Sequence, residues 1–348
     1  WEDVEYIREI GANTVRLAHY QHNQEFYDAC DEAGLIVWAE IPFISVMNED
    51  PAAHENCRSQ MKELIYQNYN HPSICFWGIA NEITIGGMKE GLLDNLKDLN
   101  QLVHQLDPTR QSTIAQVSMV PMDSPMNEIT DVVSYNHYFG WYGGKLTGNE
   151  EWLDKFHAMH PNIPIGISEY GAEGIITYHG DSPVVKDYSE GYQALYHEHM
   201  AKIIAERPWL WATHVWNMFD FGCDGRDEGG VAGRNNKGLM TFDRKIRKEA
   251  FYLYKAYWSE EPFVYVCGRR YAQRAGEKTT VKVYTNQPSV ALYLDGQRFE
   301  VKNANKVVVF ENVPLNEGFT TVVAKAGEWM DSIFFFNDTA TTEIYTLP

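Results

Sequence analysis

Two glutamates of this sequence, Glu82 and Glu169, each stand at the end of a short apolar run. Residues 73–81 and 163–168 predict buried strands, and each strand delivers a carboxylate at its C-terminal end. In a parallel α/β fold, reacting groups gather at those ends, so the pair predicts a paired-carboxylate enzyme. Hydrolysis of a glycosidic bond needs such a pair, because one carboxylic acid protonates the leaving oxygen while a carboxylate attacks the sugar or activates water.

Three polar residues could support this chemistry from the ends of predicted strands. Asn81 directly precedes Glu82 and could hydrogen bond to the sugar hydroxyl next to the reacting carbon. Arg16 and His19 close a predicted strand at 13–18, where a guanidinium could hold a nucleophilic carboxylate ionised and oriented. The alternative for Arg16 is a structural ion pair.

Two further strand ends carry candidate residues. Asn136 ends the predicted strand 131–136, and the hydroxyl of Tyr138 just beyond it could donate to the nucleophile. Trp216, near the end of the last predicted strand, could form a flat apolar floor under a sugar ring. The alternatives are an aromatic residue at the rim for Tyr138 and a buried core indole for Trp216.

The order of elements up to about residue 258 is the βαβα pattern of a parallel sheet. Apolar runs predict seven strands, at 13–18, 35–40, 73–81, 111–116, 131–136, 163–168 and 210–217. Amphipathic stretches between and before them predict helices, at 2–10, 24–33, 55–69, 91–106 and 188–206.

Seven βα units are one short of the eight that close a barrel. The chain opens on a predicted helix, and its first residue is Trp1, not Met. We therefore expect residues 1–260 to form an N-terminally truncated (β/α)8 TIM barrel that lacks its first strand.

After residue 260 the pattern changes to the period-2 alternation of antiparallel strands, at 280–284, 290–294, 306–310 and 319–324. This pattern predicts a small immunoglobulin-like β-sandwich over residues 261–331. Residues 332–348 match neither pattern and resemble the translation of a sequencing adapter. We expect this segment to be a non-native tail without function.

The composition excludes several classes of partner. The net charge of −19, from 48 acidic and 29 basic residues, argues against nucleic acid or an anionic membrane and favours a neutral small molecule or a sugar. The five cysteines are scattered without a C-x-x-C pair, so they predict free thiols. No apolar stretch reaches the ~18 residues of a membrane span.

Four segments together resemble the catalytic barrel of glycoside hydrolase family 2, namely residues 13–20, 71–82, 168–171 and 216–220. A further run, through 224–230 and 233–238 to 257–258, is most similar to the bacterial β-galactosidases of that family. The resemblance covers roughly residues 1–260. It implies a (β/α)8 barrel that hydrolyses β-linked sugars.

The resemblance also implies roles for the two glutamates. Glu82 matches the general acid/base and Glu169 the nucleophile of a retaining double displacement, with carboxyl groups ~5 to 5.5 Å apart. Burial and the charge of Glu169 should raise the pKa of Glu82, while Arg16 and Tyr138 keep Glu169 ionised. We expect a soluble bacterial β-galactosidase that needs no cofactor and can assemble into a homo-oligomer, in the cytoplasm, the periplasm or outside the cell. Some family members bind magnesium beside the acid/base, but the strand at 35–42 offers only Glu40, so we predict no metal.

Two alternatives stay open. Asn235 and Lys237 match the Asn-x-Lys element with which β-glucuronidases of the family grip the sugar carboxylate, and an amide with a cation suits that group. The same residues occur in the galactosidase-like run, so they do not decide, and we favour the galactoside. A non-catalytic carbohydrate-binding protein is the alternative of another class, but it would be expected to have lost one of the two carboxylates.

Overall fold

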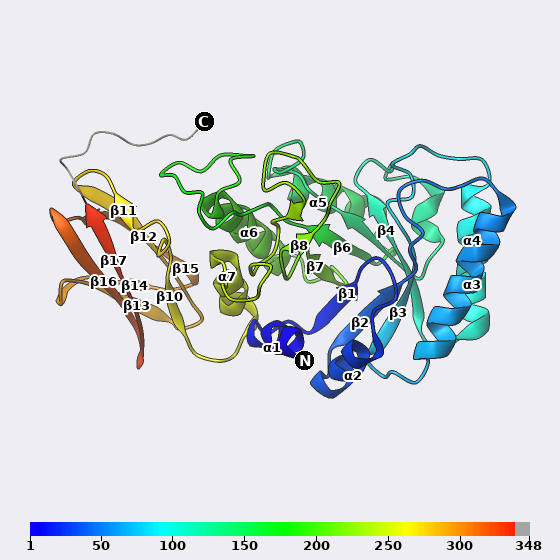
Figure 1. The fold of residues 1–348 in the computed structure, drawn as a ribbon, viewed down its shortest axis with the longest axis horizontal. Helices are drawn as coiled ribbons and strands as arrows, with labels where there is room; N and C mark the ends of the chain where they lie inside the picture. Colours follow the sequence, from blue (N-terminus) through cyan, green and yellow to red (C-terminus); the bar gives the residue numbers. More distant parts are fainter. Residues whose placement is uncertain (338–348) are drawn as a thin grey trace. The chain divides into compact units, whose positions relative to one another are not determined.

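The computed structural model describes residues 1–337, which divide into two compact units. The first unit comprises residues 1–8, 12–171 and 202–216 and contains one parallel sheet (Figure 1). Strands that follow one another in the chain are also neighbours in this sheet, as in a barrel. The seven strands are β1 (Thr14–Leu17), β2 (Ile36–Glu40), β3 (Ile74–Asn81), β4 (Gln111–Val117), β5 (Val132–Asn136), β6 (Ile165–Tyr170) and β7 (Thr213–Val215).

The two outermost strands of this sheet, β1 and β7, are linked by side chains. Thr14 Oγ1 on β1 lies 3.2 Å from His214 Nε2 on β7. Trp38 on β2 packs edge-on against the same His214 ring, with centroids 5.7 Å apart. The sheet is therefore a nearly closed barrel of seven strands, and the predicted barrel lacking one strand is confirmed.

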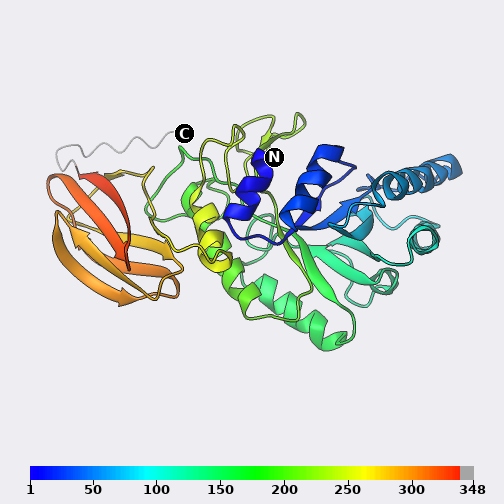
Figure 2. The ribbon, with the colours of Figure 1, turned by 90° about the horizontal axis from the view of Figure 1, so that it is seen from below.

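Helices connect the strands, and α3 and α4 lie side by side against the outer face of β2, β3 and β4 (Figures 1 and 2). Local sequence sets the ends of the helices, as α2 shows. The Asn23 side chain accepts a hydrogen bond from the Phe26 N–H at the start of α2, and Gly34 ends this helix at φ 68°. The helices are α1 (Glu2–Glu9), α2 (Gln24–Ala33), α3 (Pro51–Asn68), α4 (Leu92–Leu106), the 3-10 helix η1 (Pro125–Glu128), α5 (Gly148–Met159) and α6 (Glu190–Ala205).

The second unit comprises residues 9–11, 172–201 and those from 217 onward. It contains a short ribbon of β8 (Phe221–Gly222) and β9 (Arg234–Asn235), then α7 (Glu249–Trp258). Two sheets follow. One holds β10 (Val264–Val266), β12 (Lys278–Thr285) and β15 (Lys306–Pro314); the other holds β11 (Gln273–Arg274), β17 (Trp329–Asn337), β16 (Gly318–Ala326), β13 (Ser289–Leu294) and β14 (Gln297–Asn303).

The two sheets share one apolar core, so they form the predicted β-sandwich. Val283 and Phe310 from one sheet pack with Leu292, Val322 and Phe335 from the other, and all are buried. Along β13, β16 and β17, buried residues alternate with more exposed ones, as the period-2 pattern predicts.

The first part of the segment expected to be a tail forms a strand, and its non-native origin stays a prediction. Residues 332–337 belong to β17, which pairs with β16, and Phe335 is only 1% exposed in the sandwich core. Residues 338–348 lie outside the described part of the chain, and their non-native origin stays a prediction. The predicted domain boundaries at 260 and 331 also stay predictions.

Within residues 1–337, none of the helices is both long and apolar enough to cross a membrane.

Candidate active site

The C-terminal ends of the barrel strands bring most of the predicted site residues into one hydrogen-bonded cluster. Its members come from β1, β3, β5 and β6 and from the segments that follow β1, β3, β5 and β7. They are Arg16, His19, Asn81, Glu82, Asn136, Tyr138, Glu169 and Trp216.

Arg16 lies at the centre of this cluster. Its Nη1 donates to Glu169 Oε1 at 2.8 Å, and its Nη2 donates to Asn81 Oδ1 at 2.8 Å. Nε and Nη2 donate to the two oxygens of Glu40, each at 2.9 Å. Burial lowers the pKa of Arg16, but the charges of Glu40 and Glu169 outweigh it and raise that pKa above its ordinary value. Arg16 is therefore a permanent buried cation shared by two carboxylates.

Glu169 is buried at the end of β6, with a donor on each oxygen. Arg16 contacts Oε1, and the hydroxyl of Tyr138 donates to Oε2 at 2.8 Å. Burial and the charge of Glu169 raise the pKa of Tyr138 well above its usual range, so the hydroxyl keeps its hydrogen. The two contacts fix the orientation of the carboxylate.

Glu82 follows β3 and has a different environment. Its backbone adopts φ 47°, in the left-handed region that residues other than glycine rarely occupy and that often marks functional sites. Asn136 Nδ2 donates to Glu82 Oε1 at 3.0 Å. Burial and the negative charge of Glu169 raise the pKa of Glu82 above its ordinary value. Glu82 is thus suited to hold a proton, as a general acid must.

Two amides are held between these carboxyl groups. Ser168 Oγ donates to Asn136 Oδ1 at 2.6 Å, so Asn136 turns its Nδ2 toward Glu82 and toward Asn81 Oδ1, which is 3.1 Å away. Because Arg16 and Asn136 both donate to Asn81 Oδ1, the Nδ2 of Asn81 is the donor left for a ligand.

His19 and Trp216 form a stacked pair, with ring centroids 5.2 Å apart and an interplanar angle of 18°. Nδ1 of His19 lies 2.8 Å from Glu40 Oε1, and Nε2 lies 3.9 Å from Glu169 Oε1. The predicted role of Trp216 as a floor for a sugar ring stays a prediction.

Glu40 is the residue of this cluster that sequence reasoning missed. It is 1% exposed at the end of β2, and Arg16 and His19 hold its pKa below the ordinary value against the effect of burial. The signal was present, since residues 35–40 are an apolar run that ends in a carboxylate, like the runs before Glu82 and Glu169.

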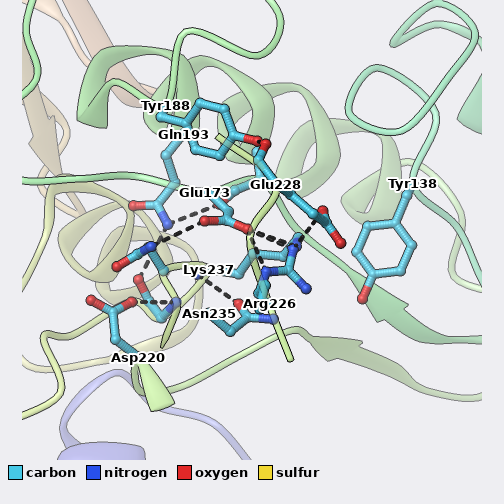
Figure 3. A network of polar contacts seen from close by, with 12 residues as sticks. Tyr138, Glu173, Tyr188, Gln193, Asp220, Arg226, Glu228, Asn235 and Lys237 are labelled. Carbon is cyan, nitrogen blue, oxygen red and sulfur yellow. Dashed lines mark hydrogen bonds and ion pairs between the residues drawn. The ribbon is translucent and has the colours of Figure 1, made fainter. Parts of the chain in front are cut away.

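Asn235 and Lys237 belong to the second unit. Lys237 is 1% exposed, and its Nζ lies 3.4 Å from Glu173 Oε1 (Figure 3). Arg226 donates to the same oxygen, with Nη2 at 2.6 Å and Nε at 3.0 Å. Burial, together with the charge of Arg226, lowers the pKa of Lys237 to about 8. Glu173 and Arg226 were missed because neither stands at the end of a predicted strand.

One group of described residues has the spacing of a metal site, namely Asp28, Asp31 and His71. Asp31 already accepts from the Ser73 N–H at 2.9 Å and lies 2.6 Å from His71 Nδ1. These contacts explain the group as a hydrogen-bonded connection between α2 and the start of β3, and the expectation of no metal stays a prediction.

Comparisons with known proteins place the chain in a family. Residues 1–261 match the model described as "Glycosyl hydrolases family 2, TIM barrel domain", and residues 276–329 match a domain of unknown function, DUF4982. A β-glucuronidase of Bacteroides fragilis is 42% identical, over 91% of this chain and 47% of its own length.

Two solved structures extend the comparison. The structure of an FMN-binding β-glucuronidase from Faecalibacterium prausnitzii has a TM-score of 0.97 and 59% identity, covering 100% of this chain and 54% of the other. That of a putative β-galactosidase from Bacteroides fragilis has a TM-score of 0.90 and 35% identity, covering 97% of this chain and 52% of the other.

The expected likeness to β-galactosidases is thus accompanied by a stronger likeness to proteins described as β-glucuronidases. The chain spans about half the length of the relatives it matches. Both the matched barrel model and the residues at its strand ends lead to the same conclusion: this chain belongs to glycoside hydrolase family 2.

Proposed function

We propose that this chain carries the catalytic barrel of a β-glucuronidase, a retaining enzyme that releases terminal β-D-glucuronic acid. The observation that carries the reaction class is the cluster of Glu82 and Glu169 with two different sets of partners. Glu82, with its raised pKa, serves as general acid/base, and Glu169, gripped by Arg16 and Tyr138, serves as nucleophile.

The reaction proceeds in two displacements. In the first, Glu169 attacks the anomeric carbon, the bond to the leaving oxygen breaks, and that oxygen takes the proton of Glu82. In the second, Glu82 as a carboxylate takes a proton from water, and the water oxygen displaces Glu169. Asn81 Nδ2 donates to the sugar hydroxyl beside the reacting carbon. This mechanism requires the two carboxyl groups to lie ~5 to 5.5 Å apart.

The choice of glucuronide over galactoside reverses the preference that the sequence alone suggested. It is supported by the names of the relatives from B. fragilis and F. prausnitzii. It is also supported by the chemistry of Asn235 and Lys237, because an amide donor and a buried cation suit the carboxylate that glucuronic acid has and galactose lacks.

The test compares turnover of p-nitrophenyl β-D-glucuronide and β-D-galactoside. We expect the glucuronide to be the better substrate, and we expect Lys237→Met to lower kcat/KM for it roughly 100-fold, the value of a charge-assisted hydrogen bond. Lys245→Met is the matched control, because the Lys245 side chain is 79% exposed. Faster turnover of the galactoside by the unmodified chain would contradict the choice of sugar.

A non-catalytic carbohydrate-binding protein is the alternative of another class. Release of p-nitrophenol that disappears in Glu169→Gln would exclude it, since binding alone frees no phenol. The oligomeric state of the protein stays a prediction.

A further inference from the structure

Glu40 has no role in the two displacements above, yet it is the most heavily hydrogen-bonded carboxylate of the cluster. It accepts two parallel hydrogen bonds from Arg16, each of 2.9 Å, in the fork geometry of strong Arg–carboxylate pairs. His19 Nδ1 lies 2.8 Å from its Oε1. Because both oxygens are occupied and the residue is buried and ionised, Glu40 is not a proton donor.

We propose that Glu40 is a positioning residue of the glycosidase site: it is the permanent counterion that keeps Arg16 paired while Glu169 changes from a carboxylate to an ester. The proposal rests on the proposed function, because it assigns Glu40 a part in the same double displacement.

All the hydrogen-bond donors of the Arg16 guanidinium are engaged. A guanidinium has five N–H groups. Two of them donate to the two oxygens of Glu40, and a third donates to Asn81 Oδ1. The remaining two donate to Glu169 Oε1 and, at 3.2 Å, to the Ser168 carbonyl oxygen. Every donor has an acceptor, so the guanidinium has one orientation, and Glu40 supplies two of the contacts that set it.

The charge around Arg16 changes during the proposed reaction. In the free enzyme, buried Arg16 faces two carboxylates, Glu40 and Glu169. When Glu169 forms its bond to the sugar it loses its negative charge, and the charge left by the transferred proton appears on Glu82. Without Glu40, the guanidinium would then be a buried cation without an ion-pair partner, which is a costly state. Glu40 removes that cost from the glycosylation step.

Glu40 also contacts the ring of His19. An ionised carboxylate can only accept hydrogen bonds, so the hydrogen between Glu40 and His19 lies on Nδ1. Nε2, which lies 3.9 Å from Glu169, is then the nitrogen without a hydrogen in the neutral ring. Glu40 therefore also sets the tautomer of a residue that stacks on Trp216.

The test follows formation of the ester directly. Cyclophellitol aziridines are sugar-shaped inactivators; a carboxylate opens the three-membered ring, the C–N bond breaks, and the nitrogen takes the proton of the acid. The full chain is incubated with the glucuronic acid-configured and the galactose-configured aziridine, and intact mass gives the labelling rate. We expect Glu40→Gln to label at least about 100-fold more slowly than the unmodified chain, whereas Glu63→Gln, on the exposed face of α3, labels at the unmodified rate.

Two further variants separate positioning from folding. Glu40→Asp keeps the negative charge and so restores the counterion of Arg16. We therefore expect it to be labelled at least about tenfold faster than Glu40→Gln, even where both variants melt at a lower temperature than the unmodified chain. Glu169→Gln should not be labelled. Labelling of Glu40→Gln within threefold of the unmodified chain, or equal rates for the Asp and Gln variants, overturns the proposal.

The outcomes distinguish this proposal from the proposed function. Labelling of the unmodified chain by the galactose-configured aziridine alone would overturn the choice of glucuronide. The labelling rates of the Glu40 variants would then be compared with the galactose-configured aziridine. An unmodified chain labelled by neither aziridine would overturn both.

Discussion

Individual side chains in this barrel owe their chemistry to a small number of fixed hydrogen bonds. Asn136 is the clearest case, because Ser168 orients its amide and its Nδ2 then reaches Glu82. A donor beside a carboxyl oxygen favours the ionised form, so Asn136 opposes the rise in pKa that burial and Glu169 produce in Glu82. The pKa of Glu82 is therefore set by burial and Glu169, which raise it, and by the hydrogen bond from Asn136, which lowers it.

This balance predicts the pH dependence of Asn136→Ala. Loss of the donor raises the pKa of Glu82 further, so the protonated, active form persists to higher pH and the alkaline limb of kcat/KM moves upward. The rate at the optimum should fall roughly tenfold, the value of one hydrogen bond. Steady-state rates of glycoside hydrolysis across pH 4–10 measure both effects. Asn162→Ala, at an exposed position, is the control, and an alkaline limb that stays in place or moves downward would contradict the role of Asn136.

Among the elements, β2 and β3 show how backbone spacing makes room for the buried charges. Glu40 and Gly78 are register partners on these strands. A Cβ at Gly78 would lie 2.3 Å from Trp38 Nε1 and 2.6 Å from Glu40 Cβ, closer than atoms can approach. The absence of a side chain at residue 78 therefore leaves room beside β3 for Glu40, which pairs with Arg16.

Gly78→Ala should displace Glu40 and Trp38. We expect a loss of about 1–3 kcal/mol in the free energy of unfolding, typical of an overpacked core, with a loss of hydrolysis larger than the fraction unfolded explains. Denaturant unfolding and glycoside turnover measure the two effects. Gly143→Ala is the matched control, since a Cβ there meets nothing within 4 Å. Equal behaviour of the two variants would show that the space beside Glu40 is not limiting.

The strands of the barrel could be predicted from sequence because each is an apolar run between turn residues, and all seven predicted strands are present. Helix α5 was not predicted, because its residues are charged and aromatic and its Thr147 cap makes no side-chain hydrogen bond. The edge strand β14 was missed because most of its residues are exposed, so no apolar alternation marks it. Strand ends likewise identified Glu82 and Glu169, but the Glu40–Arg16 pair depends on register between strands, which no pattern within one strand reveals.

At the level of the whole chain, each compact unit buries its own ionic cluster despite the net charge of −19. In the second unit, Lys248 Nζ lies 2.7 Å from Asp220 Oδ1, and Arg270 pairs with Glu190. Glu249 lies beside that second pair, its backbone N–H donating to Glu190 Oε1 at 2.8 Å. Burial and the charge of Glu190 raise the pKa of Glu249 to about 7.

This shift predicts a pH-dependent stability. A carboxyl group whose folded pKa lies above its unfolded value binds its proton more tightly in the folded state, so its contribution to stability is complete below the unfolded value and is lost as pH rises toward 7. Between pH 4.5 and 8 the loss should reach about 3 kcal/mol. Thermal melting at the two pH values should show this fall in the unmodified chain and a smaller fall in Glu249→Gln. Glu260→Gln, at an exposed position, is the control; identical pH dependence in all three chains would refute the assignment.

The contact between Asn136 and Glu82 also has a stereochemical consequence. Because an N–H group points at Oε1, the hydrogen of protonated Glu82 lies on Oε2. In the proposed mechanism, proton delivery to the glycosidic oxygen therefore starts from one defined oxygen, and the approach of the aglycone is restricted to the directions that this O–H bond can reach. A substrate whose glycosidic oxygen lies toward Oε1 would bind without reacting, so the amide on β5 selects among poses of a bound glycoside as well as adjusting the acid.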